Sequence, residues 1–276
     1  MLMISPRAEP AAIPAFVRAK GGVRLVFGSV ARGTAPLTIA ETGGYRVRFP
    51  RTGEGVLINT GGGMTGGDRM RVDALVQAGA TAVLTTQAAE KIYRSDGHDT
   101  GMAVSLALEE ASRLAWLPQE QILFNGARLA RTLDVAMAPD AALTLVESVV
   151  FGRLAMGEAM EEGTFRDRWR LRRDGRLVLA EDVLLDGRIS DTLKRPAAAN
   201  GARALATFLH VAPEAEARLE AARSMLDNAA SECGVTAFDG MLIARFLAAD
   251  PRVLRADLAR FIEAFRGEPM PRSWQT

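Results

Sequence analysis

The sequence predicts one mainly β domain over residues 1–276, built as a long multi-stranded meander, a sandwich or a β-helix-like stack, with two helices near the C-terminus. The first observation is a series of short apolar runs, many with a period of two, that end in glycine, asparagine or aspartate. The second is that helical periodicity begins only after residue 213. The third is that strand and helix patterns do not alternate, which argues against a parallel sheet covered by helices.

The N-terminal part of the chain predicts a lead-in followed by short strands. Residues 1–15 contain several prolines but no periodicity, and we expect them to be flexible. From Met70 to Val76 the apolar residues occupy alternate positions, as in a strand with one buried face. The strands predicted in this part are residues 23–30, 45–49, 56–58, 69–77 and 81–86.

The glycine run that ends at Asp68 raises the question of nucleotide binding. Gly61, Gly63 and Gly66 fit the pattern G-x-G-x-x-G, the basis of an alternative hypothesis: an NAD-dependent oxidoreductase. That fingerprint needs a helix after the last glycine, because the helix N-terminus holds the pyrophosphate. Strand periodicity follows instead, and no Lys-Ser or Lys-Thr pair completes a P-loop. We therefore expect a tight turn in which glycine permits positive φ angles.

The middle of the chain continues the β pattern. Residues 102–109 alternate, although a helix is possible for so short a run. Residues 122–124 resume the β pattern, and the pair Asn125-Gly126 predicts a hairpin turn. Further apolar runs then predict strands at residues 128–137 and 142–151.

A second hairpin is predicted around Asp174-Gly175, between strands at residues 164–173 and 177–185. In the first of these strands the apolar residues share one parity, with Asp167 as the exception. The other parity is a row of arginines, which is either a solvated face or a surface that meets an acidic partner. The row consists of Arg166, Arg168, Arg170 and Arg172.

Helices are predicted in two segments near the end of the chain. Residues 214–228 are rich in helix-forming side chains and carry an apolar stripe. Asp250-Pro251 has the sequence of a helix N-cap and first helical residue, which predicts a helix over residues 251–266. Residues 241–247, between the two segments, predict a buried strand.

The composition narrows the possible functions. The formal net charge of +1 gives no global signal for nucleic acid or a membrane surface. One cysteine, Cys233, is typical of a reducing compartment, and no secretory pattern begins the chain, so we expect a cytoplasmic protein. The two histidines, His98 and His210, are too few to build a His/Cys metal cage with that cysteine.

Several motifs, in order, make this chain resemble the UreD (UreH) family of urease accessory proteins. They span nearly the whole sequence. The usual proline that follows the double threonine is Gln87 here. The motifs are GGGMTGGD at 61–68, TTQAAEKIYRS at 85–95, WLPQEQILFNGARL at 116–129, GRLAMGE at 152–158, RDRWRLRRDGRLVLAEDVLLDG at 166–187, MLIARFLAAD at 241–250 and PRSWQT at 271–276.

The resemblance implies a chaperone without enzymatic activity of its own. Proteins of this family are largely β, with helices towards the end. They bind a helical accessory protein of the UreF type, which recruits a GTPase of the UreG type, and the assembly docks on urease apoprotein. GTP hydrolysis by the partner drives nickel into urease, and the nickel passes through a tunnel in the UreD-like subunit. The resemblance thus implies transient handling of nickel and no permanently bound cofactor.

A conduit should hold nickel weakly, whereas a permanent nickel site would favour imidazole or thiolate ligands. The candidate carboxylates within or beside the matched segments are Asp68, Glu147 and Glu158. Each has an ordinary alternative, because Asp68 could cap a turn and the glutamates could pair with Arg153 or another arginine. A third hypothesis is a β-rich interaction module with no role in metal transfer.

Overall fold

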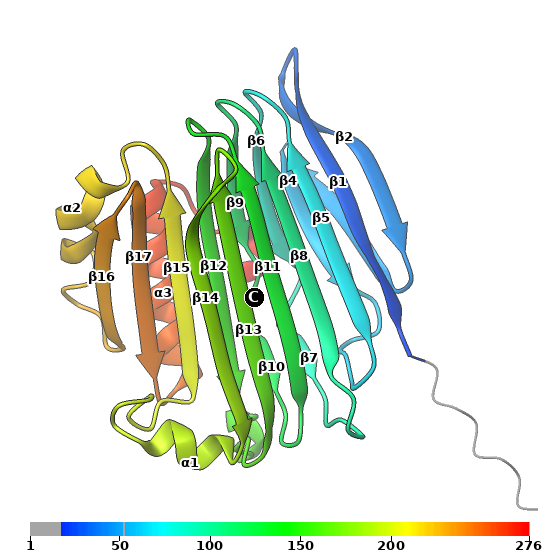
Figure 1. Cartoon of the computed structure of the whole chain (residues 1–276), viewed down its shortest axis with the longest axis vertical. Helices are drawn as coiled ribbons and strands as arrows, with labels where there is room; N and C mark the ends of the chain where they lie inside the picture. The colour runs from blue at the N-terminus through cyan, green and yellow to red at the C-terminus, as the bar shows by residue number, and fades with distance from the viewer. Residues whose placement is uncertain (1–17, 52, 276) are drawn as a thin grey trace, which may run out of the picture.

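The computed structural model describes residues 18–51 and 53–275, and in this part the chain is mainly β. Two large sheets face each other, as Figure 1 shows, with helix α3 (Pro251–Arg266) behind the second sheet. The fold class predicted from the sequence is confirmed, and its β-helix-like form is the one observed. The lead-in expected at residues 1–15 lies outside the described residues.

The first sheet has seven strands, and five of them run parallel. Strand β1 pairs in parallel with β5, β5 with β8, β8 with β11, and β11 with β13. The two edge strands, β2 and β14, are antiparallel to their neighbours. Across the sheet the order is β14 (Arg176–Gly187), β13 (Gly163–Arg173), β11 (Arg128–Met137), β8 (Thr100–Leu108), β5 (Arg69–Val76), β1 (Lys20–Val30) and β2 (Gly33–Thr42).

The second sheet has a parallel centre and antiparallel ends. Strands β4, β6, β9 and β12 are parallel, and the short strands β7 (Glu90–Ile92) and β10 (Gln121–Leu123) extend them beside β12. The main path is β16 (Glu232–Phe238), β17 (Met241–Ala248), β15 (Ala204–Val211), β12 (Ala142–Phe151), β9 (Arg113–Leu117), β6 (Thr81–Thr86), β4 (Glu54–Asn59) and β3 (Tyr45–Arg51).

The chain passes from one sheet to the other and back, so that successive passes stack as coils of a solenoid. Residues in register on neighbouring strands of the first sheet form apolar ladders that point towards the second sheet. One ladder crosses the sheet from β1 to β13 and is buried at every step. It consists of Val23, Val72, Val104, Leu133 and Trp169.

The two predicted turns have different outcomes. The hairpin at Asp174-Gly175 is confirmed: it joins β13 to β14, and both residues have positive φ, 52° and 72°. The hairpin at Asn125-Gly126 is wrong, because β10 lies in the second sheet and the next strand, β11, lies in the first. Gly126 does take a positive φ of 78°, so the turn signal was correct while the pairing was not.

The helices differ from the prediction in one segment. Helix α3 starts at Pro251 as predicted, and the Asp250 side chain accepts a hydrogen bond from the Arg252 backbone N–H (2.9 Å). The segment 214–228 forms only a 3-10 turn (Glu216–Arg218) and the short helix α2 (Leu219–Ser224), because it then turns into β16. A further short helix, α1 (Ile189–Lys194), follows β14. Among the described residues, no helix has the length and apolarity needed to cross a bilayer.

Candidate functional site

A cavity of about 260 Å³ lies between the two sheets and is lined by residues of both. Its apolar walls include Val72 and Val104 of the first sheet and Leu57 and Trp116 of the second. Polar side chains also reach it from several strands, which is unusual for the interior of a β fold. They include Tyr45, Asn59, Glu90, Gln121, Arg131 and Glu147.

The polar groups at one end occupy equivalent inward positions on three strands. Arg131 on β11 is in register with Asp167 on β13, and Glu147 faces them from β12. On each strand the inward neighbours on either side are apolar, so these charges separate two apolar clusters. We call Arg131, Glu147 and Asp167 the charged layer.

Every member of the charged layer is buried and hydrogen-bonded. Arg131 Nε donates to Asp167 Oδ1 (2.8 Å), and its two terminal nitrogens form ion pairs with Asp167 and Glu147. Trp116 Nε1 donates to Glu147 Oε1 (2.8 Å), and Gln121 contacts both Arg131 and Glu147. A buried ionic group is tolerated when its hydrogen-bonding atoms have partners, as those of the charged layer do.

Within the charged layer, burial and the neighbouring groups shift the pKa of Glu147 in opposite directions. Burial raises the pKa of Glu147, although Arg131 and the hydrogen bond from Trp116 act in the opposite direction. Burial also opposes the charge of Arg131, but Asp167 and Glu147 raise its pKa, so it stays protonated. One arginine thus faces two carboxylates, of which Glu147 lines the cavity.

Glu90, which the sequence analysis missed, also lines the cavity. Its Oε1 accepts a hydrogen bond from Asn59 Nδ2 (2.9 Å), and burial raises the pKa of its carboxyl to about 7. Burial, with Glu90 and Asp68 nearby, also raises the pKa of Tyr45. Glu90 is in register with Gln121 on the adjacent strand, so polar side chains continue from Asn59 to the charged layer. Glu90 lies within the motif TTQAAEKIYRS, which could have identified it as a further candidate carboxylate.

The Asp68 side chain stabilises the glycine-rich turn through hydrogen bonds. Its two carboxylate oxygens accept backbone hydrogen bonds from Ala19 (2.7 Å) and Thr65 (2.8 Å). Strand β5 begins directly after it, at Arg69, so the helix required by the dinucleotide hypothesis is replaced by a strand. The structure therefore gives that hypothesis no support at the glycine run.

Replacing the buried Asp68 with alanine is expected to lower the free energy of unfolding by about 1.5–3 kcal/mol, because two backbone N–H groups lose a charged acceptor. Urea titration followed by circular dichroism measures the change. The matched control is Asp140→Ala in an exposed turn, which should have little effect. Equal stabilities of the Asp68 and Asp140 variants would contradict this role.

The remaining candidates lie outside the cavity lining. Glu158 forms an ion pair with Arg153 and accepts a hydrogen bond from the Asn125 backbone N–H (3.2 Å). Within residues 18–51 and 53–275, no three His, Cys, Asp or Glu side chains are grouped so that they could hold a metal ion. Of the three predicted carboxylates, Glu147 lines the cavity, whereas Asp68 and Glu158 do not. The contact of each of the three with nickel stays a prediction.

The predicted arginine row lies on the outer face of the first sheet. Arg166, Arg168 and Arg172 are exposed, while Asp167, the exception in the opposite parity, points inward to Arg131. Arg166 pairs with Asp182 on β14, and Arg170 donates to the backbone oxygens of Trp169 and Glu181. The role of the row as a partner surface stays a prediction.

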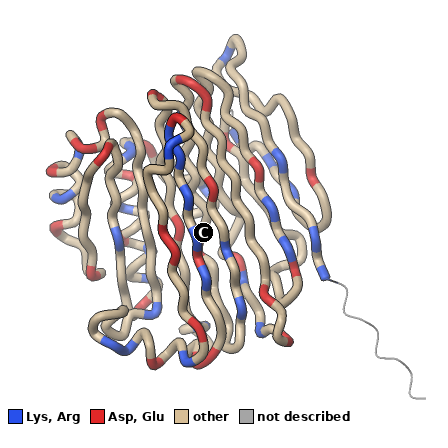
Figure 2. Tube along the Cα trace, in the orientation of Figure 1, with Lys and Arg blue, Asp and Glu red and all other residues tan. Residues whose placement is uncertain are grey.

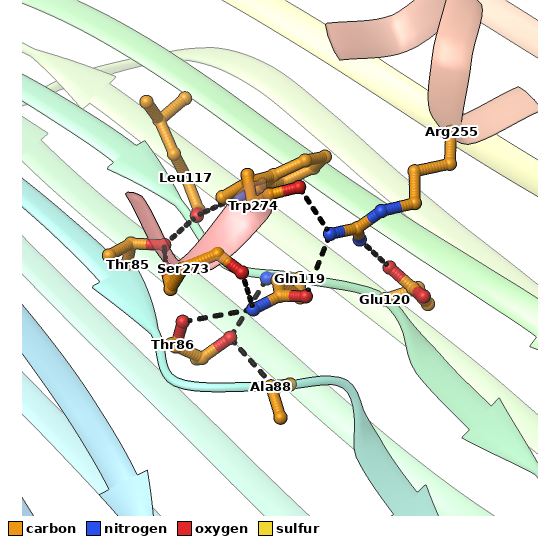
Figure 3. A network of polar contacts seen from close by, with 9 residues as sticks. All are labelled: Thr85, Thr86, Ala88, Leu117, Gln119, Glu120, Arg255, Ser273 and Trp274. Carbon is orange, nitrogen blue, oxygen red and sulfur yellow. Dashed lines mark hydrogen bonds and ion pairs between the residues drawn. The ribbon is translucent and has the colours of Figure 1, made fainter. Parts of the chain in front are cut away.

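The C-terminal segment braces the wall of the cavity (Figure 3). Gln119 lines the cavity, and its Nε2 donates to the backbone oxygen of Ser273 (2.9 Å). Trp274 Nε1 donates to the backbone oxygen of Leu117 (3.0 Å). The Arg255 guanidinium from α3 lies 4.7 Å from the Trp274 ring and donates to Gln119 Oε1 (3.0 Å). The 3-10 turn Arg272–Trp274 therefore fixes the end of β9 and the residues after it.

Substitution Trp274→Ala is expected to reduce stability by about 3–5 kcal/mol, since a buried aromatic ring and its hydrogen bond are both lost. Trp274→Phe keeps the ring above Leu117 and loses only the hydrogen bond, so it should cost about 1 kcal/mol. Thermal and urea unfolding of the two variants test the difference. If both variants unfold like the wild type, the segment does not brace the fold.

Comparison with known proteins connects this architecture to a family. The family model described as "UreD urease accessory protein" matches residues 19–275. "Urease accessory protein UreD" of Methylobacterium sp. (strain 4-46) is 52% identical, over 94% of this chain and 95% of the relative. The protein of the same name from Azorhizobium caulinodans is 46% identical, over 96% and 99% of the two chains. The match covers both sheets, the cavity and the C-terminal segment, and so the chain belongs to the UreD family of urease accessory proteins, with a role in urease maturation.

Proposed function

We propose that this chain is a scaffold and a nickel conduit in urease maturation, and that it acts in the cytoplasm without catalysing a reaction itself. Its partners in this proposal are a UreF-like helical accessory protein, a UreG-like GTPase that joins through the complex, and urease apoprotein. Nickel is the cargo and is held only in transit. Membership of the UreD family supports the maturation role.

The observation that carries the conduit proposal is the line of polar side chains through an otherwise apolar interior. Glu90 and Glu147 both reach the cavity, and Gln121 lies between them. Oxygen donors of this kind bind a divalent cation less tightly than imidazole or thiolate would. None of the residues that line the cavity is a histidine or cysteine. The wall thus favours exchange of the ion over storage.

For a cation to pass, Arg131 must keep a counterion while Glu147 contacts the ion. Because its guanidinium pairs with Glu147, a cation that reaches this carboxylate competes with an arginine. The second carboxylate, Asp167, can keep the guanidinium paired while Glu147 faces the ion. Passage in this proposal therefore shifts Arg131 towards Asp167 and leaves no buried charge without a counterion.

Reconstitution with the three partners tests the scaffold part of the proposal. The chain should co-purify with the helical partner, the GTPase and apo-urease, and urease should activate with nickel and GTP only when the chain is present. Activation of equal extent without the chain would contradict the maturation role. A stable complex that forms but gives no dependence of activation on the chain would leave only the β-rich interaction module.

A further inference from the structure

The outer face of the first sheet has a trough that the cavity and the conduit do not use. Two hollows, of about 580 and 380 Å³, adjoin along this face, and Arg71 borders both. Their floor comes from β8 and β11, whose outward residues are mostly small. The floor consists of Gly101, Ala103, Ser105, Ala107, Ala130, Thr132, Asp134 and Ala136.

Arginines border this floor on both sides. Arg24, Arg69 and Arg71 stand on the β1 and β5 side, and the predicted row of arginines stands on β13. Figure 2 shows basic residues on strands at both sides of the sheet that faces the viewer. Arg71 pairs with Asp73 and Arg166 with Asp182. Within the described residues, Arg24, Arg168 and Arg172 are exposed and form no ion pair. The face is basic although the whole chain is nearly neutral.

The dimensions of the trough fit one α-helix. From β5 to β13 there are three strand intervals, roughly 14 Å in all at a spacing of about 4.8 Å. A helix with its side chains is about 10–12 Å across. Six of the eight floor residues are glycine, alanine or serine, and these short side chains allow the helix backbone to approach closely. Arg168 and Arg172 are about 13 Å apart along the strand, which corresponds to roughly nine residues of helix.

We propose that this trough binds an acidic amphipathic helix of a protein partner, with its small or apolar face on β8 and β11 and its carboxylates towards Arg24, Arg71, Arg168 and Arg172. Nucleic acid fits less well, because no aromatic side chain lines the trough to stack on a base. The inference rests on the scaffold part of the proposed function and is independent of nickel transfer.

The probe is a fluorescein-labelled peptide of about twenty residues, helical, with alanine and leucine on one face and glutamates along its flanks. Fluorescence anisotropy with the full chain should show saturable binding that weakens as salt increases. The double variant Arg168→Glu/Arg172→Glu should weaken binding by at least about fivefold, since two attractive pairs become repulsive. Asp134→Asn removes a carboxylate from the floor and should strengthen binding.

Two controls separate a trough from simple charge attraction. Arg32→Glu/Arg195→Glu makes the same change in net charge at exposed positions away from the trough, and it should keep the wild-type affinity. Ala103→Lys adds a positive charge but obstructs the floor, so a trough predicts weaker binding and charge attraction predicts tighter binding. The latter result would overturn the proposal.

Three other results would also overturn the inference: no binding of the peptide, equal loss in the control double variant, or equal affinity for a single-stranded oligonucleotide of the same charge. A concentration-dependent dimer in sedimentation, abolished by Arg168→Glu/Arg172→Glu, would assign the face to a second copy and contradict the helix assignment. Because these measurements contain neither urease nor nickel, their failure is distinguishable from failure of the maturation role.

Discussion

Arg131→Met is expected to lower the free energy of unfolding by about 3–5 kcal/mol, one of the largest effects of a single substitution in this chain. The substitution leaves Glu147 and Asp167 buried without the guanidinium that both contact. Removing one partner from a buried ionic group is costly because the remaining charge stays desolvated. Urea unfolding at neutral pH, followed by circular dichroism, measures the loss.

The charged layer also predicts a rescue. In the triple variant Arg131→Met/Glu147→Gln/Asp167→Asn the uncompensated charges are gone, so much of the lost stability should return. Arg166→Met is the matched control, because its ion pair with Asp182 lies on the surface and should contribute little. A triple variant that is less stable than Arg131→Met would show that the charges themselves do not cause the loss.

The contribution of Glu90 to stability should fall as the pH rises from about 4.5 to about 7, whereas His210, whose pKa burial lowers to about 4, contributes in the opposite direction up to about pH 6.5. The folded pKa of Glu90, about 7, lies above its ordinary value of 4.5, so the folded state holds a proton that the unfolded state has lost. Stability therefore decreases across this interval, by up to about 3 kcal/mol for this group. The raised pKa of Glu147 acts in the same direction.

The variant Glu90→Gln isolates this contribution, because glutamine has no charge to bury at any pH. Unfolding free energies of the wild type and the variant, measured at half-unit steps from pH 4.5 to 8, should diverge with the variant more stable at the upper end. A constant difference over the whole interval would contradict the raised pKa.

The raised pKa has a further consequence for metal binding. A cation that binds at Glu90 near neutral pH releases a proton.

The sequence was sufficient to predict the parts of the fold that have local signals. The alternation from Met70 to Val76, the Asp174-Gly175 turn and the Asp250-Pro251 helix start all follow from short-range chemistry. Strand β15 was missed, because half its residues are buried in a continuous apolar run at its end rather than in alternation. Strand β7 was also missed, because three residues are too few to show a period, whereas β10 overlaps the β pattern predicted at residues 122–124.

The site required contacts that no local pattern contains. Asp167 stood out in the sequence as a carboxylate in an apolar parity, and the structure explains it by Arg131 on the neighbouring strand. Stacking of the coils then brings Glu147 from the opposite sheet to the same guanidinium. From the motifs, Asp68 and Glu158 looked equivalent to Glu147. In the structure, Asp68 accepts a backbone hydrogen bond in the glycine turn, and Glu158 pairs with the partly exposed Arg153. Asp68 and Glu147 are both buried, and what distinguishes them is the set of partners that the assembled coils bring to each.

The measurement that tests the central claim most directly is urease activation by the double variant Glu90→Gln/Glu147→Gln in the reconstituted complex. Both substitutions should preserve the fold, because Arg131 keeps Asp167 and Asn59 keeps an amide partner. The conduit predicts that the complex assembles normally while nickel-dependent activation falls by about tenfold or more. The matched control, Glu161→Gln at an exposed position, should activate like the wild type. Full activation by the double variant, with its complex intact, would contradict a path for nickel through this cavity.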